Sequence, residues 1–220
     1  MTQDSMPSDQ KLLENLVKAL MQNTDIGAAY ARQLPNAECS FVERYTRSFN
    51  YPDQSVVKTK KDLPVYGIKT FFCSNVCAAY KKDIYQKMGG FIRKAIFNED
   101  MIYAGRLIQE GYAIAYAADA RVIHSHNYSC RQQFHRNFDL GVSQAEHPEI
   151  FEGIPSEGEG IKLVKKTIIY LAKKGKIWLI PGVILQSGCK YAGYLAGKKY
   201  RKLPKKMILW CTMNREYWNV

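Results

Sequence analysis

Several side chains in this sequence carry functional groups that enzymes use. Asp4, within the segment TQDS, lies just ahead of a stretch with helical spacing. A loop that leads into a helix at the edge of an α/β sheet often presents metal or phosphate ligands. The alternative for a lone Asp at such a position is a helix cap or a turn former. Asp4 is therefore a candidate ligand for a divalent cation or a diphosphate.

Adjacent carboxylates, Glu99 and Asp100, begin a second candidate site. Asn98 is a capping residue and Gly111 a stop signal, so the pair occupies the first turn of a predicted helix, where carboxylates favour the positive end of the helix dipole. A functional alternative is that one of them is a general base that takes a proton from a substrate hydroxyl. Neighbouring residues on a helix point about 100° apart, so one carboxylate can face a substrate while the other does not.

His124 and His126 lie in VIHSHNY, at the end of a predicted strand. Alternate residues of a strand project to the same face. Both imidazoles could bind one metal ion, or one could bind the metal while the other donates to a phosphate. The next predicted helix carries cationic groups that suit a diphosphate or are simply solvated. These are Arg131, His135 and Arg136.

The segments that must position these side chains mix helices and strands, which predicts the α/β class. Alternation at Ile26, Ala28 and Tyr30 indicates a half-buried strand, and residues 33–67 read as a long loop of the kind that forms a lid or binding segment. The remaining expected elements are a helix at 12–20, a strand at 70–80, a helix ended by Gly89 and Gly90, a helix at 98–111, extended pieces at 112–116 and 121–124, and a helix at 130–144.

The charge of the 220-residue chain is unevenly distributed. The formal net charge is +12, and residues 161–220 hold 14 Lys and Arg but one acid, Glu216. Basic amphipathic helices with aromatic residues are typical of a membrane-surface element, although a solvated helical subdomain has the same pattern.

No apolar run approaches the roughly 20 residues of a spanning helix, and six scattered cysteines fit a cytosolic protein. We expect a core at 1–150, a linker at 151–160 and a basic helical tail at 161–220.

The order of several motifs resembles a known family. The motifs are TQDSMPSD, AAYARQLP, ERYTRSFNYP, GIKTFFCSNVCAAYKKDIYQKMGGF and IFNEDMIYAGRLIQEGYAIAYAADARVIHSHNY. Together they resemble the second half of a family 2 glycosyltransferase, in the bacterial rhamnosyltransferase branch, from about Thr2 to Ser143 and more loosely into the tail. The resemblance implies a GT-A fold, which is a Rossmann-like sheet that binds a nucleotide-sugar and a divalent metal, Mg or Mn.

The resemblance also implies roles for individual residues. Asp4 matches the last acid of a D-x-D-type motif, which binds the metal and the donor diphosphate; Thr2 and Gln3 precede it, so fewer carboxylates are present than in the usual motif. Asp100 matches the catalytic base of inverting transfer, with Glu99 as its orienting neighbour. His126 is the expected C-terminal ligand of the metal or the diphosphate, and His124 is the second choice for this role. Ser74 and Asn75 are placed near the sugar and Arg131 near the diphosphate.

Family members ordinarily have a further nucleotide-binding half that these residues do not match. The chain is therefore expected to be an N-terminally truncated GT-A enzyme, with a separate N-terminal partner chain as one option. A catalytically inactive remnant or partner subunit that retains membrane association is the alternative function. The missing strands would leave one sheet edge exposed.

The expected partners follow from the same resemblance. The donor is dTDP-rhamnose, the acceptor a surface polysaccharide or lipid-linked saccharide, and the basic tail binds an anionic membrane surface. The expected location is cytoplasmic, peripheral to the inner face of the plasma membrane. A nucleic-acid partner is not expected, because the basic charge occurs on apolar helices without a recognition motif.

Overall fold

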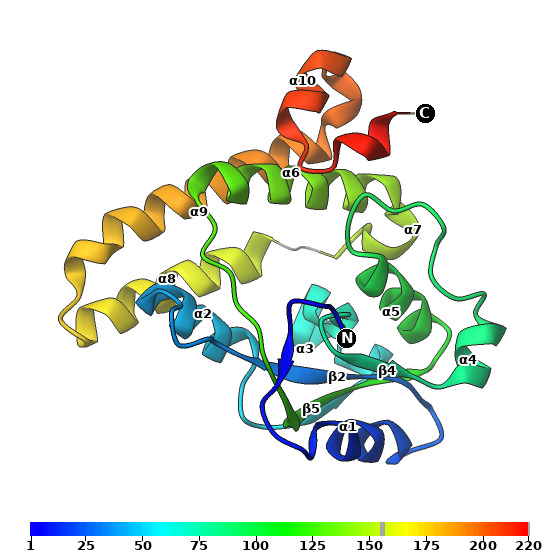
Figure 1. Ribbon diagram of the computed structural model, residues 1–220. Helices are drawn as coiled ribbons and strands as arrows, with labels where there is room; N and C mark the ends of the chain where they lie inside the picture. The colour runs from blue at the N-terminus through cyan, green and yellow to red at the C-terminus, as the bar shows by residue number, and fades with distance from the viewer. Residues whose placement is uncertain (155–156, 220) are drawn as a thin grey trace. The chain divides into compact units, whose positions relative to one another are not determined.

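The computed structural model describes residues 1–154 and 157–219 (Figure 1). The chain forms two compact units. The first unit comprises Met1–Ile92 and Asp100–Asn127, and the second comprises Arg93–Glu99 and Tyr128–Val220. Helix α6 (Cys130–Glu146), which the sequence analysis assigned to the core, is thus part of the second unit.

A five-stranded mixed sheet organises the first unit, in agreement with the predicted α/β class. Its strands are β1 (Met6–Pro7), β2 (Ile26–Leu34), β3 (Val56–Lys58), β4 (Ala78–Tyr80) and β5 (Ala113–Ile123). The order is β1-β5-β2-β4; β2 runs parallel to β5, and the other pairs are antiparallel. Both β1 and β3 pair with the edge of β5 that faces away from β2, so β5 and β2 form the centre of the sheet.

Helices α1 (Leu12–Met21) and α5 (Glu99–Gln109) lie on opposite sides of this sheet (Figure 1). Helix α1 packs Leu12, Leu16 and Leu20 against alanines of β2 and β5. From the other side, Leu107 of α5 lies close to Gly27. Strand β2 is therefore buried on both faces, and the prediction of a half-buried strand was wrong, because the alternation of large and small residues reflects packing rather than exposure.

The predicted loop at 33–67 is largely structured. It contains α2 (Phe41–Asn50), β3, a 3₁₀ turn at Lys60–Asp62 and α3 (Leu63–Tyr66). Helix α2 has a Ser40 cap and a Glu43–Arg47 ion pair, but none of its residues is fully buried. Its apolar residues Phe41, Tyr45 and Phe49 nevertheless recur every four residues, which is a helical spacing that the prediction of a loop missed.

Two strand predictions also differ from the structure. Within the predicted strand at 70–80, only β4 is extended, and Gly67–Phe71 forms a 3₁₀ helix. The extended pieces expected at 112–116 and 121–124 form one strand, β5, whose register against β2 shifts between Ala117 and Arg121. The helix stops were predicted correctly: Gly89 and Gly90 follow α4 (Lys82–Lys87), Gly111 follows α5, and all three glycines have positive φ.

The second unit is helical. Its elements are α6, α7 (Pro148–Phe151), α8 (Glu157–Lys173), a 3₁₀ turn at Ile177–Leu179, α9 (Ile180–Lys198), a 3₁₀ turn at Tyr200–Lys202, α10 (Lys205–Cys211) and a 3₁₀ turn at Arg215–Trp218. Part of the predicted linker at 151–160 is therefore helical, from Glu157 onward. Helices α6 and α9 run in the same direction, with Gly193 against Phe134 and Gly197 against Phe138. Within the described ranges, none of the helices combines the length and apolarity needed to cross a bilayer.

Candidate functional site

Strand pairing brings Asp4 to the end of β5. In the antiparallel pair of β1 and β5, Met6 lies opposite Ile123, so the residues before β1 meet those after β5. The Thr2 amide and the Ser5 hydroxyl both donate to the Val76 carbonyl and anchor the segment around Asp4. The register of two strands thus joins residues 120 positions apart.

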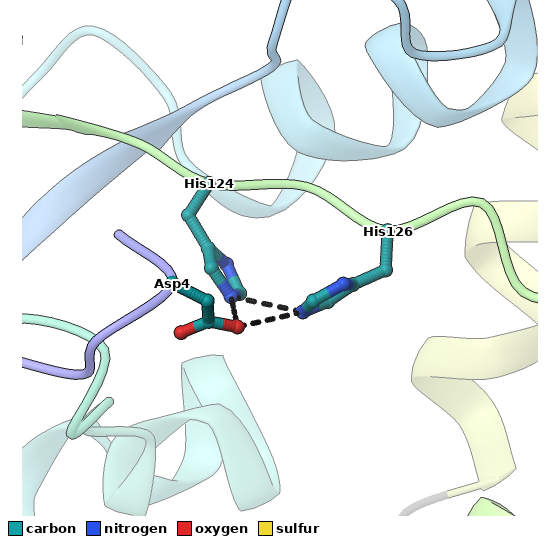
Figure 2. A group of neighbouring side chains, drawn as sticks. All are labelled: Asp4, His124 and His126. Carbon is teal, nitrogen blue, oxygen red and sulfur yellow. Dashed lines mark hydrogen bonds and ion pairs between the residues drawn. The ribbon is translucent and has the colours of Figure 1, made fainter. Parts of the chain in front are cut away.

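Asp4, His124 and His126 form a compact group of possible metal ligands (Figure 2). The Asp4 Oδ2 atom lies 3.2 Å from His124 Nε2 and 3.3 Å from His126 Nε2. The two Nε2 atoms are 3.0 Å apart. All three residues named in the sequence analysis as metal ligands therefore direct one ligand atom toward a common point.

The neighbouring Gln33 fixes the tautomer of His124. Arg47 donates Nη1–H to the Gln33 side chain, and because a guanidinium has only donors, the atom it meets must be the amide oxygen Oε1. His124 Nδ1 lies 3.0 Å from the same oxygen and must therefore be the protonated nitrogen. Consequently, Nε2 of neutral His124 presents a lone pair toward Asp4.

The charge state of the group follows from its surroundings. His124 is 8% exposed, and its burial, together with the nearby Arg47 charge, lowers its pKa. The Thr2 hydroxyl, and less strongly His124, lower the pKa of the more exposed Asp4 carboxyl. A neutral imidazole nitrogen and a carboxylate oxygen, both acceptors, thus lie 3.2 Å apart. A proton on His126 Nε2 or a cation between the three atoms is needed to make this arrangement favourable.

The donor set fits a divalent transition metal. Ligand atoms about 2.0–2.2 Å from one ion lie roughly 3 Å apart at adjacent coordination positions, which the three observed separations match. Two imidazoles and one carboxylate suit Mn²⁺, Fe²⁺ or Zn²⁺ better than Mg²⁺, which prefers oxygen ligands and bound water. The hydrogen bond from His124 to Gln33 is the outer contact that orients such a ligand.

Asp100, at the second position of α5, occupies a separate part of the first unit's polar network. Its Oδ2 accepts the Asn75 backbone N–H at 2.9 Å, and its Oδ1 accepts the Met101 N–H at 2.7 Å. These contacts fix the orientation of the carboxylate, whose oxygens can each accept more than one hydrogen bond. Glu99 is half-buried at the first position of α5, and the carboxylate bonded to Asn75 is that of Asp100.

The segment Ser74–Asn75 connects the two groups. Gln33 Nε2 donates to the Ser74 hydroxyl at 2.9 Å, while the next residue, Asn75, binds Asp100. The Asn75 side-chain oxygen also accepts the Tyr80 hydroxyl at 2.7 Å. The chain His124–Gln33–Ser74–Asn75–Asp100 therefore links the ligand group to the candidate base.

Cys73, immediately before this segment, is not a candidate nucleophile. Burial raises the pKa of its thiol to about 12, so the thiolate is scarce at neutral pH. Its sulfur lies 3.7 Å from the Tyr80 hydroxyl, and the residue is buried in the core of the unit.

Arg131 lies in the second unit, at the start of α6. Its Nε donates to His135 Nε2 at 3.2 Å, and His135 Nδ1 donates to the Cys211 carbonyl at 2.7 Å. Arg131 thus contributes to the attachment of α10 within its own unit. The structure does not join it to the Asp4 group, since the two belong to different units.

Three contributors to the network are absent from the sequence prediction: Gln33, Arg47 and Tyr80. The spacing of Glu43 and Arg47 is a signal for a helical ion pair, which the structure contains at 2.6 Å. For Gln33 and Tyr80 the sequence has no local signal, because Gln33 binds partners 41 and 91 positions away, and Tyr80 resembles any core aromatic residue.

The chain is similar along its whole length to two curated Salmonella proteins. The O-antigen chain rhamnosyltransferase WbaN of Salmonella anatum is 40% identical over 222 residues, which span 100% of this chain and 69% of that protein. The O-antigen chain rhamnosyltransferase RfbN of Salmonella typhimurium strain LT2 has the same identity and coverage. No protein-family model matches the chain. These relatives favour a transferase over the alternative of a non-catalytic partner subunit. The chain belongs to the family of O-antigen chain rhamnosyltransferases and is a glycosyltransferase.

Proposed function

We propose that the protein transfers rhamnose from dTDP-rhamnose to a growing, lipid-linked surface polysaccharide, with inversion at the anomeric carbon, in a GT-A-type site. The observation that carries the proposal is the continuous polar network between the Asp4 group and Asp100 within one unit. A transferase needs one region that binds a diphosphate and another that holds a base, and this network supplies both types of group.

Asp100 is the proposed base. It accepts the proton of an acceptor hydroxyl, whose oxygen forms a bond to the anomeric carbon while the bond from that carbon to the diphosphate oxygen breaks. The Asn75 and Met101 amides hold the carboxylate in one orientation, which favours a productive approach of the hydroxyl. Glu99 is proposed to orient the acceptor, and Ser74 and Asn75 to contact the sugar.

Asp4 Oδ2, His124 Nε2 and His126 Nε2 are the proposed ligands of a divalent ion, for which we favour Mn²⁺ over Mg²⁺ because of the two imidazoles. When bound, the ion neutralises negative charge on the departing nucleoside diphosphate.

The basic tail is proposed to hold the enzyme at the cytoplasmic face of the inner membrane, where a lipid-linked acceptor is anchored. The excess of Lys and Arg in residues 161–220 supports this location.

The proposed reaction is tested by following transfer from dTDP-rhamnose to membrane-derived acceptor by NMR. The product is expected to have the anomeric configuration opposite to that of the donor. A product with retained configuration would contradict the role of Asp100, because retention requires a different chemical sequence.

The ion site is tested separately by Mn²⁺ titration. Asp4→Ala is expected to weaken binding about 10- to 100-fold, since it removes one of three ligand atoms. Glu14→Ala, at an exposed acid of α1, serves as the control and should leave the affinity unchanged. Equal Mn²⁺ affinities of wild type and Asp4→Ala would contradict the proposed ion site.

A further inference from the structure

The outward face of α9 and its preceding turn is unusually apolar. Five large side chains on it are exposed, and we name them the outer stripe: Ile177 (62%), Trp178 (66%), Ile184 (55%), Leu185 (62%) and Tyr191 (54%). Their spacing is seven residues, from Ile177 to Ile184 to Tyr191 and from Trp178 to Leu185, which places them on one side of a helix.

The opposite face of α9 is already occupied. Val183, Gly193, Tyr194 and Gly197 are buried. Gly193 and Gly197 lie directly against the backbone of α6, and the Tyr194 hydroxyl donates to Gln144 of α6. The outer stripe is thus a second apolar face, which the helices of its own unit leave exposed to solvent.

Basic residues bracket the outer stripe at both ends. Lys173 and Lys174 are exposed at the end of α8, before the turn. Lys198 at the end of α9 and Lys199 just after it are exposed, and Lys198 lies seven residues beyond Tyr191 of the outer stripe. The Lys176 ammonium also lies over the Trp178 ring, 5.4 Å from its centroid. Residues 160–215 contain no acid at all.

We propose that the outer stripe of α9 inserts into the interface of an anionic lipid bilayer, with the flanking lysines among the headgroups. An apolar face rich in aromatic and branched residues, bordered by lysines, is the pattern of helices that lie in the membrane plane. The inference deepens the membrane-surface part of the proposed function, and its test needs no transfer activity.

Charge favours lipid over a second copy of the chain. A symmetric dimer through this face would bring the same lysine clusters of both copies together, and no acid within residues 160–215 could compensate them. An anionic phospholipid surface instead attracts each of these lysines and accepts the apolar side chains.

Helix α1 offers a matched control. Its outward positions Leu13 (71%), Val17 (51%) and Met21 (65%) are as exposed as the outer stripe. However, α1 belongs to the near-neutral part of the chain and carries Glu14 among these residues. If exposed apolar area alone caused membrane binding, the two faces would contribute alike.

The experiment measures co-sedimentation of the full chain with phosphatidylethanolamine–phosphatidylglycerol vesicles. Ile184→Ser with Leu185→Ser is expected to lower the partition coefficient about ten-fold or more, because two apolar side chains leave the interface. Lys198→Gln with Lys199→Gln should lower it about ten-fold on these vesicles. Leu13→Ser with Val17→Ser should change it less than about two-fold.

A second measurement reports insertion directly. Brominated lipids should quench the tryptophan fluorescence of the wild type, and Trp178→Phe should remove most of the quenching while binding is largely retained. Quenching that persists in Trp178→Phe would overturn the proposal, as would equal losses of binding in the α1 and α9 variants. Vesicle binding unchanged in Ile184→Ser with Leu185→Ser, together with conversion of a dimer to a monomer, would assign the face to a second copy instead.

Discussion

Gln33 in the first unit and Asp139 in the second are both buried polar side chains, 3% and 2% exposed, and each binds three partners. Gln33 binds Ser74, Arg47 and His124, which belong to the candidate site. Asp139 accepts the Thr212 hydroxyl and the amides of Met213 and Asn214. Equal burial and equal hydrogen bonding thus serve different ends. In the first unit the buried side chain orients residues of the candidate site, whereas in the second it holds the unit's own C-terminal segment in place.

The largest effect is expected at the far end of the Gln33 network. Asp100→Asn keeps an oxygen for the Asn75 amide but removes the proposed base, so the rate of rhamnosyl transfer should fall about 10³-fold. Initial rates with saturating dTDP-rhamnose measure the loss. Glu110→Gln, just beyond the other end of α5, should be indistinguishable from wild type. Normal turnover of Asp100→Asn would contradict the proposal that Asp100 is the catalytic base.

Asp139→Ala tests the second unit. Three donors lose their acceptor, so the free energy of unfolding should decrease by about 3 kcal/mol. Thermal denaturation measures the change. The Mn²⁺ affinity of the folded variant should remain that of wild type. A loss of Mn²⁺ affinity in Asp139→Ala would contradict the conclusion that Asp139 acts only within the second unit.

Gln33→Leu tests whether the buried polar side chain of the first unit orients the candidate metal ligands. The substitution removes the acceptor that fixes the His124 tautomer, so Mn²⁺ affinity should fall about 10- to 100-fold. Gln144→Leu is the matched control, since Gln144 is 5% exposed, lies in the second unit and accepts the Tyr194 hydroxyl. Calorimetric titration of both variants separates the two cases, and equal affinities would refute the orienting role of Gln33.

The smallest effect concerns Lys58, a buried cation of the first unit whose ammonium donates to the carbonyls of Lys69 and Phe72. Burial lowers its pKa from 10.5 to about 7. Between these values the unfolded chain binds the proton and the folded chain releases it, so the contribution of Lys58 to stability rises with pH. From about pH 7 to about pH 8.5 the wild type should gain about 1–2 kcal/mol relative to Lys58→Met, measured by urea unfolding.

Exposed Lys60→Met is the control and should follow the wild-type pH profile. Asp139 has the opposite sign, because burial raises its pKa above 3.8 and its contribution to stability decreases as pH rises through the raised value. Parallel pH profiles of wild type and Lys58→Met would show that the ammonium keeps its ordinary pKa despite burial.

The sequence predicted the candidate metal ligands more completely than it predicted the fold that surrounds them. Asp4, His124 and His126 could be grouped because their types are those of metal ligands and the histidines alternate at a strand end. Asp100 stood out because it lies two residues after Asn98, which was predicted to cap the helix. These signals are local, and the structure contains the corresponding arrangement at 3.0–3.3 Å for the ligand atoms.

Most of the features that were not predicted depend on distant partners or on burial. Helix α2 is the exception, because Phe41, Tyr45 and Phe49 recur at a helical spacing that the prediction of a loop did not use. The burial of β2 on both faces depends on helices before and after it in the chain. Gln33 becomes part of the site only because the pairing of β2 with β5 places His124 beside it. The register of this pairing could not be predicted from the single sequence.

The close glycine contacts between α6 and α9 have a consequence for how α9 presents itself. An added methyl group at Gly141, Gly193 or Gly197 would collide with the backbone of the other helix. Such close backbone contacts restrict the rotation of α9 about its own axis. Three glycines therefore determine which face of α9 points away from α6, and this is the face that carries Leu185 of the outer stripe.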